Sequence, residues 1–172
     1  MRSRWGWAAL VATVGAAFCA GNVMATPPAG LTTTLYGPGA LDPVNLTARA
    51  TLPSSWNARV RTHGLSDVYV ADNTLAPGGT TGWHTHPGPS FVIVTQGSVT
   101  AYDEDDPTCT PHVYTANTPD NAFVDPGGGH VHLLRDESGA AAQTIAVQLV
   151  PAGADRRQDA PAPSACPPGV RR

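Results

Sequence analysis

Short runs of β-favouring residues, separated by turns rich in glycine and proline, recur about every ten residues through the middle of the chain. Apolar and polar residues alternate within several of these runs, which is the pattern of half-buried strands, and no stretch of this region has the apolar period of a helix. Antiparallel strands this short and this numerous are typical of a β-sandwich or a β-barrel, so we predict an all-β fold. The expected strands are 67–75, 91–96, 98–103, 112–116, 122–124, 130–136 and 142–150.

Alternation along the run 91–96 also predicts which side chains point inward. If Ser90 faces the interior, Val92 and Val94 face it too, and Phe91 and Ile93 lie on the outer face. Two large apolar residues on the outside of a central strand need cover. The N-terminal arm, the C-terminal tail or a second subunit could supply it, so a homodimer is one expectation.

The N-terminal residues 1–25 differ from this middle region. They combine Arg2 and Arg4 with an apolar stretch and a small-residue end, which is the pattern of a secretory signal peptide cleaved before Thr26. A membrane anchor is the alternative, but the apolar stretch is short and interrupted by glycines. We therefore expect a secreted or extracytoplasmic protein that is not attached to a membrane after cleavage.

Three further segments follow from composition. Residues 26–55 are rich in Pro, Gly and Thr and predict an irregular, extended N-terminal arm with one short strand near 32–36. Residues 56–151 form the predicted barrel domain, and residues 152–172 form an irregular, proline-rich C-terminal tail.

Charge and cysteine content narrow the function classes. Without residues 1–25, the chain keeps eight arginines and thirteen acidic residues, so its formal charge is 8 − 13 = −5. A mildly acidic chain with scattered arginines is not typical of a nucleic-acid-binding protein.

Cys109 and Cys166 are the two cysteines that remain, and an even pair in an exported domain predicts a disulfide that fastens the tail to the barrel. Two free thiols are the alternative.

Four of the six histidines form two closely spaced pairs, His84 with His86 and His130 with His132. Residues i and i+2 of a strand point to the same face, so each pair aims two imidazoles in one direction. Imidazole is the commonest metal ligand in proteins. Such a pair also occurs on solvent-exposed faces without any ligand, so the surrounding residues have to decide.

The spacing around the first pair resembles the first conserved motif of the cupin family. Gly78 is followed after five residues by His84, then by His86, and after three and six further residues by Ser90 and Gly97. Ser90 stands where the cupin motif has glutamate.

The second pair lies in a segment similar to the second cupin motif. Gly129, two residues, His132, three residues and Asp136 match it, with aspartate in place of asparagine and Pro126 one place early. The spacing to Asp136 favours His132 as the ligand of this motif, although the glycine run 127–129 could shift the register in favour of His130. The resemblance spans about residues 65–150, nearly the whole predicted barrel.

The resemblance implies a cupin double-stranded β-helix, also called a jelly-roll barrel, with a metal site inside it. Carried over to this chain, the implied ligands are His84, His86 and His132, and Ser90 and His130 are the candidates for a fourth ligand or for lining the cavity. Three imidazoles with open positions suit divalent Fe, Mn, Ni, Cu or Zn.

Two functions from different classes remain open at this point. The first is a metal-dependent enzyme, oxygenase-like, that acts on a small molecule. The second is a non-catalytic module that binds or senses a metal or a small ligand. A barrel with no metal at all is a third, purely structural interpretation, and resemblance in fold does not decide among them.

Overall fold

This computed structural model describes residues 24–50 and 56–166. In these residues the regular structure consists of twelve strands and no helix, as the all-β prediction requires. The strands are β1 (Ala29–Leu41), β2 (Asn45–Ala50), β3 (Trp56–Arg61), β4 (Ser66–Thr80), β5 (His84–Thr85), β6 (Ser90–Gln96), β7 (Ser98–Asp103), β8 (His112–Thr115), β9 (Ala122–Asp125), β10 (His132–Arg135), β11 (Ala142–Pro151) and β12 (Gln158–Asp159).

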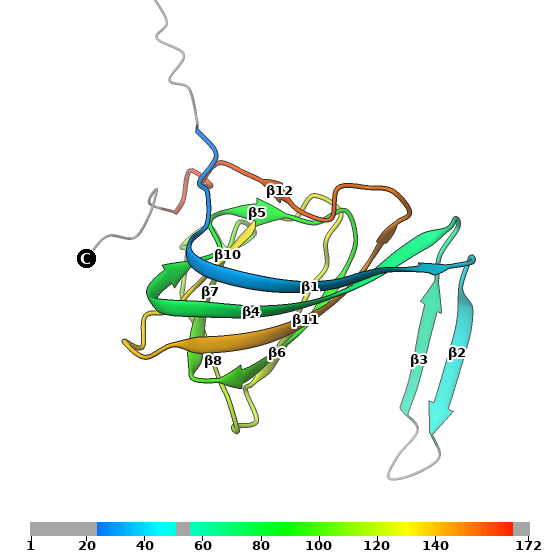
Figure 1. Ribbon diagram of the computed structural model, residues 1–172, viewed down its shortest axis with the longest axis horizontal. Coiled ribbons are helices and arrows are strands. Elements are labelled where there is room, and N and C mark those ends of the chain that lie inside the picture. The colour runs from blue at the N-terminus through cyan, green and yellow to red at the C-terminus, as the bar shows by residue number, and fades with distance from the viewer. Residues whose placement is uncertain (1–23, 51–55, 167–172) are drawn as a thin grey trace, which may run out of the picture.

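Ten of these strands form one antiparallel sheet that curls into a nearly closed barrel, so the predicted all-β barrel is confirmed (Figure 1). Hydrogen-bonded neighbours follow the order β12-β5-β10-β4-β11-β6-β9, with β1 on β4 and β7 between β10 and β8. Strand β4 is central to this arrangement, because it pairs with β1 and, through ten consecutive residue pairs, with β11.

The side chains of β6 alternate between the two faces of the barrel wall as predicted. Ser90, Val92 and Val94 are buried, whereas Phe91 is 53% exposed and Ile93 is 43% exposed. Both outer residues remain uncovered in the described part of the chain. Cover by a second subunit therefore stays a prediction.

The barrel interior changes from apolar to polar along its length. Leu75, Val94, Val99 and Ala142 form a fully buried apolar cluster, and burial of each larger side chain contributes about 1.5–3 kcal/mol. Along β11 the inward residues pass from Ala142 in this cluster to Gln148, which is buried beside polar groups. The sheet thus encloses a polar region within its walls.

The N-terminal segment is more regular than the sequence predicted. The short strand expected near 32–36 is part of the thirteen-residue β1, which pairs with β4 from Leu31 opposite Leu75 to Leu41 opposite Ser66. Nearly all side chains of β1 are exposed, so no apolar period marks this strand in the sequence. Main-chain hydrogen bonds hold it, and these depend weakly on side-chain type.

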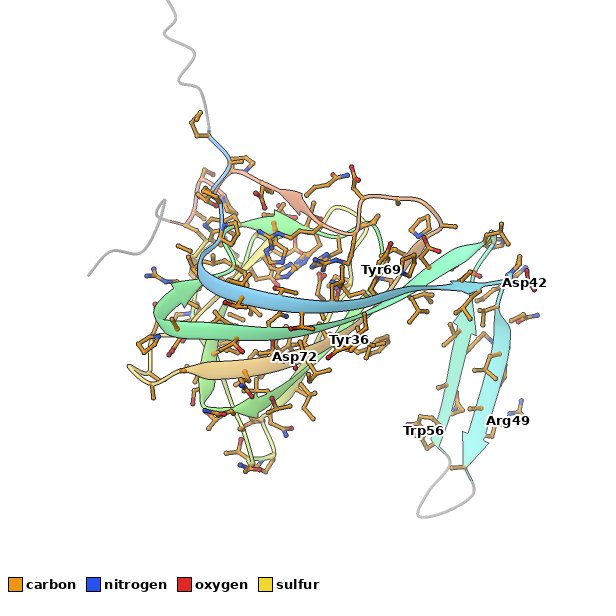
Figure 2. The ribbon with its side chains drawn as sticks, viewed as in Figure 1. Tyr36, Asp42, Arg49, Trp56, Tyr69 and Asp72 are labelled. Atoms are coloured by element: carbon orange, nitrogen blue, oxygen red, sulfur yellow. A yellow bond between two sulfur atoms is a disulfide. The ribbon has the colours of Figure 1, made fainter. Side chains whose placement is uncertain are left out.

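Trp56 was predicted to begin the barrel, but it opens β3, which pairs only with β2 in a separate two-stranded sheet. This hairpin projects away from the barrel, and Trp56 and Arg49 lie toward its far end (Figures 1 and 2). Its connecting residues 51–55 lie outside the described residues. The chain returns to the barrel at Ser66.

Residues 77–79, which include two glycines, form a bend within β4, and this strand continues to Thr80. Gly78 adopts a positive φ of 75°, and a Cβ added to Gly79 would come within 2.7 Å of the Ala76 carbonyl oxygen. Only glycine accommodates this bend without strain. The bend lets Thr80 pair with Arg135 of β10.

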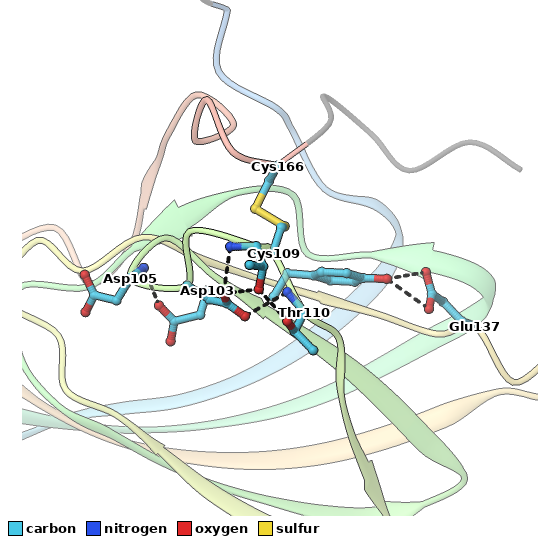
Figure 3. Close-up of a disulfide and its surroundings, with 9 residues drawn as sticks. Asp103, Asp105, Cys109, Thr110, Glu137 and Cys166 are labelled. Carbon is cyan, nitrogen blue, oxygen red and sulfur yellow. Dashed lines mark hydrogen bonds between the residues drawn. A yellow bond between two sulfur atoms is a disulfide. The ribbon is translucent and has the colours of Figure 1, made fainter.

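The C-terminal tail, predicted to be irregular, folds back over the barrel and contributes β12, which pairs with β5. The predicted disulfide is confirmed, because Cys109 and Cys166 are bonded and join the tail to the loop between β7 and β8 (Figure 3). Trp83, which directly precedes His84, packs with Tyr102, Leu133 and Cys166. This tryptophan therefore packs under the tethered tail.

The predicted signal peptide lies outside the described residues except for Met24 and Ala25. In the described part of the chain, the structure contains no helix with the length and apolar character needed to cross a membrane.

Replacing both cysteines, Cys109→Ser with Cys166→Ser, should destabilise the fold. The disulfide closes a loop with a sequence separation of 57, and the loop-entropy model assigns such a crosslink about 4 kcal/mol of unfolding free energy. Urea unfolding followed by tryptophan fluorescence measures the difference. The reduced wild type should match the double variant, and a double variant as stable as the oxidised wild type would contradict the prediction.

Candidate metal centre

Three histidines from two pairs of the sequence converge inside the barrel. His84 on β5 lies directly opposite His132 on β10 in the strand register, and His86 follows β5 by one residue. Their ring centroids are 4.3 Å apart for His84 and His132, 4.9 Å for His84 and His86, and 5.4 Å for His86 and His132. All three are buried, and one nitrogen from each lies within 4.8 Å of the others.

Main-chain carbonyls fix the rings of the first pair. The Nδ1 of His84 lies 2.9 Å from the Gly82 oxygen, and the Nδ1 of His86 lies 2.7 Å from the Arg156 oxygen. A carbonyl oxygen only accepts hydrogen bonds, so each Nδ1 carries the proton and donates it. This leaves Nε2 of both rings with a lone pair that an ion can use.

His132 has a different environment behind its ring. Its buried Nδ1 has no hydrogen-bond partner, and the nearest carboxylate oxygen is Asp125 Oδ1 at 3.6 Å. Asp125 is 3% exposed, and its Oδ2 is also without a hydrogen-bond partner. A buried carboxylate beside a ligand imidazole is a frequent second layer of metal sites, since it orients the ring and raises its basicity.

His130 is not part of the three-histidine cluster. Its Nε2 lies 2.7 Å from Asp103 Oδ1 and its Nδ1 lies 3.1 Å from Asp125 Oδ1. Asp105 Oδ2 is 3.7 Å away, so this ring sits among carboxylates, of which Asp105 is exposed to solvent. Of the two candidates left open by the sequence, the structure brings His132 to His84 and His86 and ties His130 to acidic residues.

Burial and neighbouring charges shift the pKa values of these four histidines in different directions. Burial holds the pKa of His84 well below its ordinary value and lowers the pKa of His86. Burial also lowers the pKa of His132 to about 4, against the opposing charge of Asp125. Burial alone would lower the pKa of His130, but its hydrogen bonds and charge interactions with Asp103 and Asp125 raise it overall. The three clustered rings are therefore neutral near pH 7, the form that binds metals.

Ser90 is the first of three hydrogen-bonded polar side chains inside the barrel. The Gln148 amide nitrogen donates to Ser90 Oγ at 3.0 Å and lies 3.3 Å from Nε2 of His86. Arg156 Nη1 donates to the Gln148 amide oxygen at 2.7 Å. This last hydrogen bond fixes the amide orientation, because the guanidinium group can only donate.

A cavity of about 50 Å³ adjoins the three rings, with Ser90, Gln148, Arg156 and Arg157 also in its wall. By size it admits a few water-sized groups. Sequence reasoning did not find the two arginines or Asp125, and it did not decide which face of β11 carries Gln148. The predicted disulfide was the one available signal, because a fastened tail has to lie against the barrel.

The residues present fit a divalent metal ion. Three neutral imidazoles from short, paired strands supply nitrogen ligands in a buried place, and two of them are held in one tautomer by main-chain carbonyls. Ser90 provides a hydroxyl where a carboxylate would complete the set. Nitrogen ligands of this kind favour Fe, Mn, Ni, Cu or Zn over Mg or Ca.

Comparisons with known proteins find matches among solved structures. No protein-family model and no curated protein matches this chain. A cupin domain from Bordetella pertussis is 22% identical with a TM-score of 0.38, and the match covers 48% of this chain and 80% of that one. An oxalate oxidase in complex with the substrate analogue glycolate is 21% identical with a TM-score of 0.39, covering 47% and 41%.

Peruvianin-I, a cysteine peptidase from Thevetia peruviana latex, is 22% identical with a TM-score of 0.46, and the match covers 77% of this chain and 68% of that one. The matched part spans less than half of the oxalate oxidase. With identities and TM-scores this low, these matches carry no inference about activity.

The metal-free protein should lose stability as the pH falls below 6.5. His132 has an ordinary pKa of 6.5 when unfolded and a pKa of about 4 when folded, so between these values the unfolded chain binds a proton that the folded chain excludes. The free energy of unfolding then decreases by about 1 kcal/mol per pH unit from this one ring.

Urea unfolding between pH 6.5 and pH 5, in the presence of a chelator, measures this slope. A His132→Gln variant should have a shallower slope, whereas His63→Gln, which changes an exposed histidine, should keep the wild-type slope. Parallel slopes for the wild type and His132→Gln would refute the assignment.

Proposed function

We propose that this chain binds one divalent metal ion through His84, His86 and His132. The observation that carries the proposal is the convergence of three buried imidazoles, one nitrogen from each lying within 4.8 Å of the others. Hydrogen bonds from Nδ1 to carbonyls orient two of them in advance. Preorganised neutral ligands lower the cost of binding an ion, because the rings of His84 and His86 are already oriented and their Nδ1 atoms already carry the protons.

The same proposal includes export. The disulfide between Cys109 and Cys166 is compatible with an oxidising compartment outside the cytoplasm. We propose that residues 1–25 direct the chain there and are then removed, so that the metal is acquired by an extracytoplasmic protein.

An oxygenase-like activity on a small molecule is the second candidate function. The observation that favours it is the cavity of about 50 Å³ that adjoins the three histidines, since a catalytic metal needs open positions that a substrate can reach. When bound there, an ion supplies Lewis-acid or O2 chemistry. A binding or sensing module would use the same histidines and cavity without turnover.

Metal analysis of protein purified from its export compartment tests the first proposal. The wild type should contain about one divalent ion per chain, and His84→Ala and His132→Ala should each lose most of it. Each variant keeps only two of the three protein ligands, and two neutral imidazoles bind a divalent ion weakly. His63→Ala, at an exposed histidine outside the cluster, is the matched control and should retain the ion.

Two results would count against the metal centre. One is a wild type that takes up no Fe, Mn, Ni, Cu or Zn during dialysis against each ion. The other is an equal loss of metal in His63→Ala and His84→Ala.

Oxygen uptake separates the enzyme from the binding module. Iron-loaded wild type should consume O2 with at least one compound from a panel of small phenols, thiols, diketones and carboxylic acids, and His86→Ala should not. Metal-loaded protein that binds small molecules from this panel and consumes no O2 with any of them would favour the binding module.

A further inference from the structure

The wall of the cavity beside the three histidines is positively charged. Two arginines, Arg156 and Arg157, line it, and none of the described residues in its wall is aspartate or glutamate. The remaining polar residues of the wall are neutral. Beside the metal ligands, a small cavity with this charge favours an anionic organic ligand over a neutral one.

Arg157 has its charge balanced by the protein. Its Nη2 lies 2.6 Å from Asp159 Oδ1 and also donates to the Thr81 carbonyl oxygen at 2.6 Å. Arg157 therefore has an ion-pair partner and a main-chain partner, and it serves the structure of the tail.

Arg156 has no such balance. It is half-buried, and the hydrogen bond that its guanidinium group makes in the described part of the chain goes to the neutral amide oxygen of Gln148. No carboxylate of the described residues lies within 4.0 Å of it, and Arg157 next to it has the same charge. Keeping an unpaired cation partly out of water is unfavourable unless a ligand compensates for it.

The three histidines add to this imbalance once a metal is bound. Neutral imidazoles contribute no negative charge, and Ser90 contributes none at the position where cupins have glutamate. Asp125 behind His132 is the nearest carboxylate to the three rings, so a divalent ion with these ligands would keep a net positive charge beside Arg156. An incoming anion would meet both charges in one small space.

We infer that the cavity takes a small organic carboxylate, with the Arg156 guanidinium as its charge partner beside the metal. The inference rests on the proposed metal site and names the class of ligand for it. Carboxylate and guanidinium groups match in shape and hydrogen-bonding pattern. The cavity of about 50 Å³ limits the ligand to a few non-hydrogen atoms.

The main chain of Arg156 makes a clean test feasible. Its carbonyl oxygen accepts the hydrogen bond from Nδ1 of His86, and a change of side chain leaves this carbonyl in place. Arg156→Gln removes the charge while retaining a hydrogen-bonding group, and Arg156→Lys retains the charge. Arg49, an exposed arginine toward the far end of the β2–β3 hairpin (Figure 2), provides the matched control Arg49→Gln.

Acetate and formate are the probes, titrated by calorimetry into zinc-loaded and metal-free samples of the wild type and the three variants. Arg156→Gln should bind acetate about tenfold or more weakly than the wild type, the effect of losing a charged hydrogen-bond donor. Arg156→Lys should retain part of the affinity, and Arg49→Gln should equal the wild type. Acetamide, which has the shape of acetate without its charge, should not distinguish wild type from Arg156→Gln.

Zinc content measured in the same samples separates the two proposals. If Arg156→Gln retains zinc and binds acetate as tightly as the wild type, the carboxylate inference is wrong while the metal site stands. If the wild type takes up neither zinc nor Fe, Mn, Ni or Cu, the metal site fails, and the metal-free titrations still compare Arg156→Gln with the wild type. A wild type that binds neither acetate nor formate in either state overturns the inference.

Discussion

The candidate site depends on the pairing of a two-residue strand. Strand β5 contains His84 and Thr85, and it is held between β10, through His84 opposite His132, and β12 of the tail, through His84 opposite Asp159. So short a strand has no stability of its own. A shift of one residue in the register with β10 would turn His132 to the other face of the sheet and separate the cluster.

This dependence explains which parts of the site could be predicted from the sequence. The histidines lie in or beside strands, where alternation and pairing convert spacing along the chain into direction in space. The two motifs therefore predicted His84 and His86 as one pair and favoured His132 over His130 as their partner. Asp125 and Arg156 lie at a strand end and in the tail, and their places follow from tertiary contacts that no local pattern records. Only a short part of the exposed β1 was predicted, for a related reason, since pairing with β4 determines its length.

The clustered histidines and His130 have different partners for their ring nitrogens. The clustered imidazoles are buried and neutral, and His84 and His86 donate to main-chain carbonyls, which satisfies their protons without any charge. The pKa of His130 is raised instead, because this ring lies between the carboxylates of Asp103 and Asp125. Asp125 contacts both regions, because it binds His130 and lies behind His132.

The serine at position 90 bears on the unpaired positive charge of Arg156. Gln148 connects Ser90 to Arg156 through two hydrogen bonds, so a carboxylate at position 90 would lie at the end of a polar chain that already leads to the guanidinium group. Such a carboxylate would offset the charge of a bound ion and of Arg156 together. Ser90 and the unpaired Arg156 therefore bear on one charge balance, which the proposed carboxylate ligand would complete.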